Sequence, residues 1–252
     1  MSAKGPMNSP SSTADFSARN ALNSQNPYRV NLLIKLGERS QALLDMPYAR
    51  QLDRGVDTVS AEVVNPMGPY TVEDWLAEDP PSDGSKRELI LGKIEVSLSA
   101  SGPHNLITHW LARHVDDALD EAGRDDLHVL PTANLKISTV RRTALIPDIA
   151  ILNIWPERVA FLPAQVELVV EVWSPGNDRD ERSQKFDAYA YARIPYFWTV
   201  DLDGPVVNAH ELRGGQYQLA ATLKAGEVGT ITAAPIPVTF DPAALLHRRR
   251  SQ

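Results

Sequence analysis

Apolar residues follow helical and strand periods from about residue 60 onward. Residues 104–122 place their apolar side chains on one stripe of a helix, and Gly123 follows as a natural stop. The stretch "TVEDWLAE" predicts a shorter helix, with Thr71 as its N-cap and acidic residues in its first turn. A third helix is predicted over "DERSQKFDAYAYAR", with Asp180 as its N-cap and Pro195 ending it.

Strands are predicted between and after these helices. The stretch "RELILGKIEVSLS" is typical of two short strands joined at Gly92. Three more strands are predicted at "LHVLPTANLKIS", "TALIPDIAILN" and "VELVVEVW", and a further three at "YFWTVD", "PVVNAHEL" and "GQYQLAATL". We therefore expect one domain of the mixed α/β (α+β) class over residues 59–246, with a mixed central sheet flanked by helices.

The ends of the chain differ from this domain in composition. Residues 1–27 are rich in Ser, Asn, Ala and Pro and have no period. Residues 1–58 carry a charge balance of +2, whereas the remainder carries −9, for a formal total of −7. We expect residues 1–58 to be a disordered arm or a non-native extension, with Val59 a candidate start. Residues 247–252 are expected to form a solvated basic tail.

Composition narrows the classes of function. The chain has no cysteine, which excludes disulfides, thiolate zinc sites and a cysteine nucleophile. No run approaches the roughly 18 apolar residues that a membrane span needs, and the N-terminus has no apolar segment typical of a secretory signal. These features predict a cytoplasmic protein without membrane contact. The acidic body argues against strong non-specific binding of nucleic acid through net charge alone, so a metal ion or a local basic strip would have to offset it.

Candidate chemistry centres on an acidic residue inside an apolar strand. Glu171 lies in the run "VELVVEVW", where Glu167, Glu171 and Trp173 share one face by strand alternation. The preceding strand carries Asp148 in "LIPDIAIL", and pairing of the two strands would bring both carboxylates together. Two such carboxylates repel each other unless a cation or a proton lies between them. Magnesium suits this arrangement, because it takes oxygen ligands and keeps waters.

A lysine lies within reach of this pair. The helix after the Glu171 strand presents Lys185 in its second turn and Tyr189 one turn later on the same side. Lys185 is therefore expected to reach back to the carboxylates, where it would orient water or stabilise a transition state. Tyr189 is expected to pack rather than react. Metal-bound water, two carboxylates and a lysine are the groups that phosphodiester hydrolysis uses. Replacement of Lys185 by alanine is expected to abolish most of this cleavage and leave the fold intact.

The central block resembles a known family. The stretches "YTVEDWLAEDPPSDGSKRELILGKIEVSLSASGPHN", "LIPDIAIL" and "VELVVEVWSPGNDRDERSQKFDAYAYARIPYFWTVD" are similar to the Uma family of putative restriction endonucleases. The resemblance covers roughly residues 60–246. It implies a restriction-endonuclease-like fold and a PD-(D/E)XK-type active site.

The resemblance assigns site residues one by one. Asp148 corresponds to the PD aspartate, Glu171 to the strand glutamate and Lys185 to a lysine supplied by the helix. Glu88 in "RELILG" matches the glutamate of the family pattern E-L-I-D-G, whereas Leu91 replaces the aspartate of that pattern. The lysine position of the wider superfamily is Trp173 here, so the nuclease interpretation requires Lys185 to substitute in space.

The sequence thus predicts a Mg²⁺-dependent endonuclease, with Mn²⁺ as an alternative metal and DNA as the expected nucleic-acid partner. Asp148 and Glu171 would bind the metal, Glu88 would add a ligand or hold a water, and Lys185 would act on the attacking water. Cutting both strands would favour a homodimer. The alternative is a weak or inactive binding module of the same fold. His104 either lines the cleft or lies at the surface.

Overall fold

The computed structural model describes residues 67–174 and 179–246. The expectations for residues 1–58, for Val59 as a start and for the tail at 247–252 lie outside the described residues. The fold is of the mixed α+β class with a mixed central sheet, as the sequence predicts.

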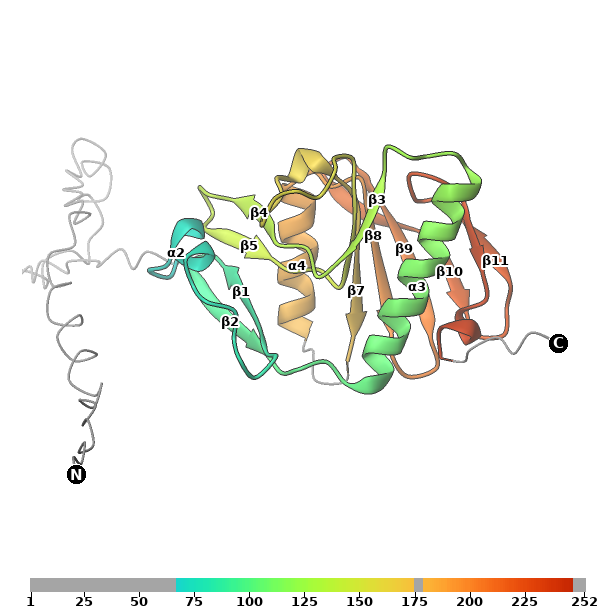
Figure 1. Cartoon of the computed structure of the whole chain (residues 1–252), viewed down its shortest axis with the longest axis horizontal. Coiled ribbons are helices and arrows are strands. Elements are labelled where there is room, and N and C mark those ends of the chain that lie inside the picture. The colour runs from blue at the N-terminus through green and yellow to red at the C-terminus, as the bar shows by residue number, and fades with distance from the viewer. Residues whose placement is uncertain (1–66, 175–178, 247–252) are drawn as a thin grey trace, which may run out of the picture. The chain divides into compact units, whose positions relative to one another are not determined.

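The central sheet has six strands in the order β10-β9-β8-β7-β6-β3 (Figure 1). Only β7 and β8 run parallel, and the helix α4 connects them. Every other neighbouring pair in this sheet is antiparallel. The strands are β3 (His128–Pro131), β6 (Ile149–Leu152), β7 (Val166–Trp173), β8 (Tyr196–Asp201), β9 (Val206–Arg213) and β10 (Gln216–Lys224).

A second sheet has four strands in the order β2-β1-β5-β4. Its outer hairpin turns at Leu91 and Gly92, which both have positive φ, as in the turn that two-residue hairpins favour. The strands are β1 (Lys86–Ile90), β2 (Lys93–Ser97), β4 (Leu135–Ser138) and β5 (Thr143–Leu145). A third, two-stranded sheet pairs β11 (Gly229–Ile231) with β12 (Val238–Phe240).

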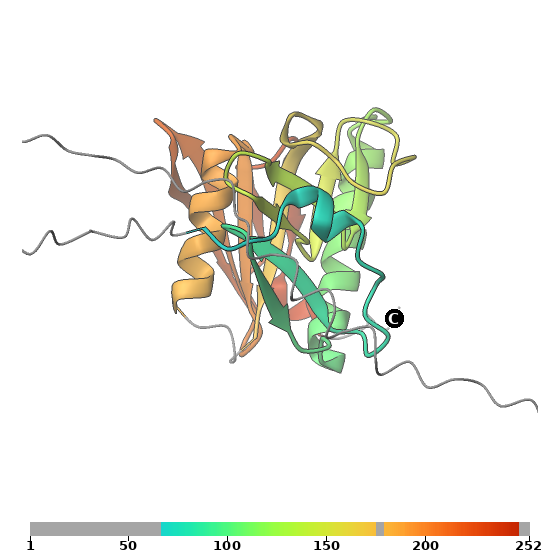
Figure 2. The same ribbon diagram turned by 90° about the vertical axis from the view of Figure 1, so that its left-hand side faces the viewer.

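Two helices cover opposite faces of the central sheet, as Figure 2 shows. The long helix α3 (Gly102–Glu121) begins at the N-cap Ser101 and buries its apolar stripe against one face. The helix α4 (Arg179–Tyr191) packs on the other face. Alternation along β7 divides its side chains between the two cores: Leu168, Val170 and Val172 face α3, whereas Val169 and Trp173 face α4. Glu171 therefore faces α4.

The short helix α2 (Val72–Leu76) caps a small third core beside β1 and β5. Thr71 is its N-cap, and a capping box with Asp74 satisfies the backbone at its start, as the sequence predicts. Two single 3₁₀ turns complete the fold at η3 (Pro163–Gln165) and η4 (Pro242–Leu245). No helix among residues 67–174 and 179–246 is long and apolar enough to cross a membrane.

Several predicted boundaries were wrong. The predicted strands at "LHVLPTANLKIS" and "TALIPDIAILN" are each two strands, because the chain leaves one sheet and enters the other within them. Pro147 lies at the second of these crossings, between β5 and β6 and outside both strands, where no backbone donor is needed. Asp180 is not an N-cap, since α4 already includes Arg179. The sequence analysis also missed β11 and β12.

We expect Gly92→Ala to destabilise the protein by about 2–3 kcal/mol. Gly92 has a φ of +77°, and an added Cβ would collide with the carbonyl oxygen of Gly68. Gly204→Ala is the matched control, because its φ of +66° is similar but no atom lies within 4 Å of the added Cβ. Urea denaturation of both variants measures the difference. Equal losses of stability would show that the contact with Gly68 is unimportant.

Candidate active site

The pairing of β6 with β7 brings Asp148 and Glu171 together. Ile149 pairs with Val170 in this antiparallel ladder, so the same register places Asp148 opposite Glu171. Opposite residues of an antiparallel pair point to the same face of the sheet. Both carboxylates are buried, with 4% and 2% of their residues' surface exposed. The convergence of Asp148 and Glu171 predicted from the sequence is therefore present.

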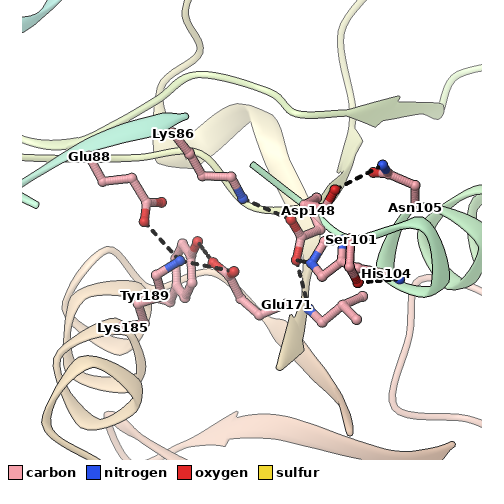
Figure 3. A network of polar contacts seen from close by, with 11 residues as sticks. Lys86, Glu88, Ser101, His104, Asn105, Asp148, Glu171, Lys185 and Tyr189 are labelled. Atoms are coloured by element: carbon pink, nitrogen blue, oxygen red, sulfur yellow. Dashed lines mark hydrogen bonds and ion pairs between the residues drawn. The ribbon is translucent and has the colours of Figure 1, made fainter. Parts of the chain in front are cut away.

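Glu171 receives two hydrogen bonds from one face of α4 (Figure 3). Lys185 donates from Nζ to Oε2 over 3.0 Å, and Tyr189 donates its hydroxyl to Oε1 over 2.6 Å. The two donors are one helical turn apart and therefore lie on the same side of the helix. Lys185 reaches Glu171 as predicted. Tyr189 packs in the core but also holds the Glu171 carboxylate, a role that the sequence analysis missed.

Lys185 joins Glu171 to the second sheet through Glu88. Its Nζ lies 2.9 Å from Oε2 of Glu88, and the other oxygen of Glu88 accepts a hydrogen bond from the backbone N–H of Ile146 over 2.7 Å. Lys185 is 3% exposed. Because it neutralises two buried carboxylates, its removal leaves them unpaired. From these contacts we now expect an alanine at position 185 to destabilise the fold, which differs from the expectation from the sequence.

Asp148 has a separate set of partners. Its Oδ2 accepts a hydrogen bond from the backbone N–H of Val172 over 2.7 Å and lies 3.3 Å from Nε2 of His104 on α3. Its Oδ1 accepts a hydrogen bond from Nζ of Lys86 over 2.8 Å. His104 is thus a buried member of the cluster and not a surface residue. Lys86 was missed, although it precedes Glu88 by two residues and must share its face of β1.

The charges of the cluster shift the pKa values of its members. Burial raises the pKa of Glu171 above its ordinary range, and the nearby Asp148 and Glu88 raise it further, against the opposing effect of Lys185. Burial alone would raise the pKa of Asp148, but Lys86 and His104 hold it well below its usual value. Ionisation is therefore less favourable for Glu171 than for a solvated glutamate, whereas it is more favourable for Asp148 than for a solvated aspartate.

The carboxylates of Asp148 and Glu171 are candidate ligands of a divalent metal ion. Asp148 and Glu171 offer hard oxygen ligands of the kind that Mg²⁺ and Mn²⁺ prefer, and Mg²⁺ needs only one or two carboxylates beside waters and phosphate. The raised pKa of Glu171 means that added positive charge would be favourable there. His104 also keeps a buried Nδ1 that has no hydrogen-bond partner among the described residues. The two carboxylates are therefore of the chemical type that an open magnesium site uses.

Residues 67–174 and 179–246 contain no group of three or more His, Cys, Asp or Glu side chains that could hold a metal ion, so they form no closed structural metal site.

Glu167 lies on the Glu171 face of β7 but hydrogen-bonds Asn153 over 2.6 Å, so it is outside the cluster, as predicted. Trp173 lies on β7 at the position to which the sequence resemblance assigns the superfamily lysine. Its ring lies 5.9 Å from Nζ of Lys185, so the helical lysine approaches that position in space.

Comparisons with known proteins concern the fold and the family of the chain. One crystal structure, described as a putative nuclease belonging to DUF820 from Anabaena variabilis ATCC 29413, matches with a TM-score of 0.55 and 16% identity. The match covers 71% of this chain and 98% of that one, and it shows a shared fold. No curated protein matches the chain. The model of the Uma2 family, described as "Putative restriction endonuclease", matches residues 73–239, more than half of the sequence. The chain therefore belongs to the Uma2 family.

Proposed function

We propose that this protein is a metal-dependent endonuclease that hydrolyses phosphodiester bonds, with DNA as its substrate. The single observation that carries the proposal is the buried cluster in which Asp148, at the residue before β6, lies opposite Glu171 of the adjacent strand β7, and Lys185 contacts Glu171 at 3.0 Å. Paired carboxylates and a lysine are the groups that metal-assisted hydrolysis of a phosphodiester requires. Membership of the Uma2 family and the fold shared with a nuclease support the proposal.

Each residue has a distinct role in this proposal. Asp148 and Glu171 hold the divalent cation, Mg²⁺ or Mn²⁺. A cation bound there would supply positive charge to the scissile phosphate and make water a stronger nucleophile. Lys185 orients the attacking water and offsets the charge that develops in the transition state. Glu88 and Tyr189 keep Lys185 and Glu171 in place, because each hydrogen-bonds one of them.

The second candidate function is a nucleic-acid or protein-binding module with weak or no catalysis. One observation favours it: both lysines of the cluster already neutralise carboxylates, so the cluster is held together without a metal. A structural ion-pair network perturbs pKa values as a catalytic site does. Metal binding and cleavage distinguish the two functions, because a binding module needs neither.

The first test of the proposal is metal binding by Glu171→Gln. We expect this variant to bind Mn²⁺ at least about tenfold more weakly than the wild type in calorimetry, because it loses a charged ligand. Glu167→Gln is the matched control, since it removes a carboxylate from the same face of β7 outside the cluster. Equal affinities of the wild type and Glu171→Gln would remove Glu171 from the metal site.

The second test concerns Lys185. We expect Lys185→Met to slow plasmid nicking in the presence of Mg²⁺ by at least about 100-fold. It should also lower the free energy of unfolding by about 3–5 kcal/mol, since it leaves two buried carboxylates without their cation. Nicking must therefore be measured at a temperature where circular dichroism shows the variant to be folded.

Two further variants separate catalysis from stability. Lys185→Arg keeps the positive charge and should be more stable than Lys185→Met, yet it should still cleave slowly, because the guanidinium is larger and fixed in geometry. Lys224→Met removes a charge from an exposed position on β10 and should nick at the wild-type rate. Wild-type nicking by folded Lys185→Met would reduce Lys185 to a structural residue.

A further inference from the structure

Lys86 and Lys185 are placed differently although both neutralise carboxylates of the cluster. The Lys185 side chain is 3% exposed and contacts two carboxylates. The Lys86 side chain is 23% exposed and its only ion pair among the described residues is with Asp148. Lys86 is the first residue of β1 and follows closely on the exposed residues 82–84, which include a turn at 82–83. Of the two lysines, Lys86 is therefore the one whose side chain has access to solvent.

The two oxygens of Asp148 are also used differently. Oδ2 has two partners that belong to the packed core, the backbone N–H of Val172 and the ring of His104. Oδ1 has the Lys86 ammonium, at 2.8 Å. A cation that binds Asp148 without disturbing the core would therefore coordinate Oδ1. In this structure the ammonium of Lys86 occupies that position (Figure 3).

We propose that Lys86 is an exchangeable cation of the site. In the metal-free protein it neutralises Oδ1 of Asp148, it leaves when a divalent cation takes that oxygen, and the freed ammonium then binds a phosphate of the substrate strand. This inference rests on the proposed function, because it assumes that Asp148 is a metal ligand. It adds a phosphate-binding residue and a competition between Lys86 and the metal.

The surroundings of Lys86 suit a phosphate. The first turn of α3 carries no acidic residue, whereas the first turns of α2 and α4 each carry two. That turn contains His104, which contacts the same Asp148 carboxylate as Lys86. A phosphate approaching Asp148 would thus meet the freed ammonium and the positive end of a 20-residue helix without a repelling carboxylate in its first turn.

The test compares Lys86→Met with Lys93→Met. Lys93 is an exposed lysine at the start of β2, in the same hairpin, so both variants lose one positive charge. By calorimetry, Lys86→Met should bind Mn²⁺ about tenfold more tightly than the wild type, because the competing charge is gone. Lys93→Met should bind Mn²⁺ with the wild-type affinity.

Nicking kinetics test the contact with phosphate. Lys86→Met should raise KM for DNA about fivefold, the effect of one partly exposed charge contact, and Lys93→Met should leave it unchanged. If Lys86→Met does not fold, as judged by circular dichroism, Lys86→Gln replaces it, since its amide still donates a hydrogen bond to Asp148.

The outcomes separate this inference from the proposed function. Equal Mn²⁺ affinities for the wild type and both lysine variants would overturn the exchange and leave the metal site standing. An unchanged KM for DNA in Lys86→Met would overturn the phosphate contact. Absence of Mn²⁺ binding in the wild type and in every variant would overturn the proposed function, and the role of Lys86 with it.

Discussion

The ion pairs of the buried Lys185 ammonium with Glu171 and Glu88 are the interaction on which the structure depends. A buried charge is tolerated only when it is paired and hydrogen-bonded. The ammonium of Lys185 lies 3.0 Å from a carboxylate oxygen of Glu171 and 2.9 Å from one of Glu88, so all three buried charges are paired. Burial alone would lower the pKa of Lys185, but the two carboxylates raise it, so the lysine stays charged. These contacts link α4, β7 of the central sheet and β1 of the second sheet.

This link explains why the candidate site lies where the two sheets approach each other. Each sheet supplies carboxylates through its own register, and neither sheet contains the full set: Glu88 comes from β1, whereas Glu171 comes from β7 and Asp148 from the residue before β6. The two helices on opposite faces of the central sheet complete the cluster from different sides. α4 supplies Lys185 and Tyr189, and α3 supplies His104.

Similarity of fold and the residues of the candidate site support different conclusions about this protein. A match at 16% identity establishes shared architecture, and one architecture supports unrelated activities. The case for a nuclease therefore depends on the residues themselves. The sequence resemblance assigns the superfamily lysine to the position of Trp173 on β7. Lys185 approaches that position from α4, with its ammonium 5.9 Å from the centroid of the Trp173 ring. Chemistry depends on where the ammonium lies in space and not on which element supplies it.

The sequence alone determined most helices and strands, the shared face of Glu171 and Trp173, and the side of α4 that carries Lys185 and Tyr189. These follow from local periods of 2.0 and 3.6 residues, which need no knowledge of distant contacts. Only the tertiary structure decided that the chain divides its strands among three sheets and that Lys86 pairs with Asp148, 62 residues away. Such contacts depend on strand order and on burial, and no local pattern encodes either. A lysine near the start of a strand has the same sequence pattern whether it is solvated or, like Lys86, held by a buried carboxylate.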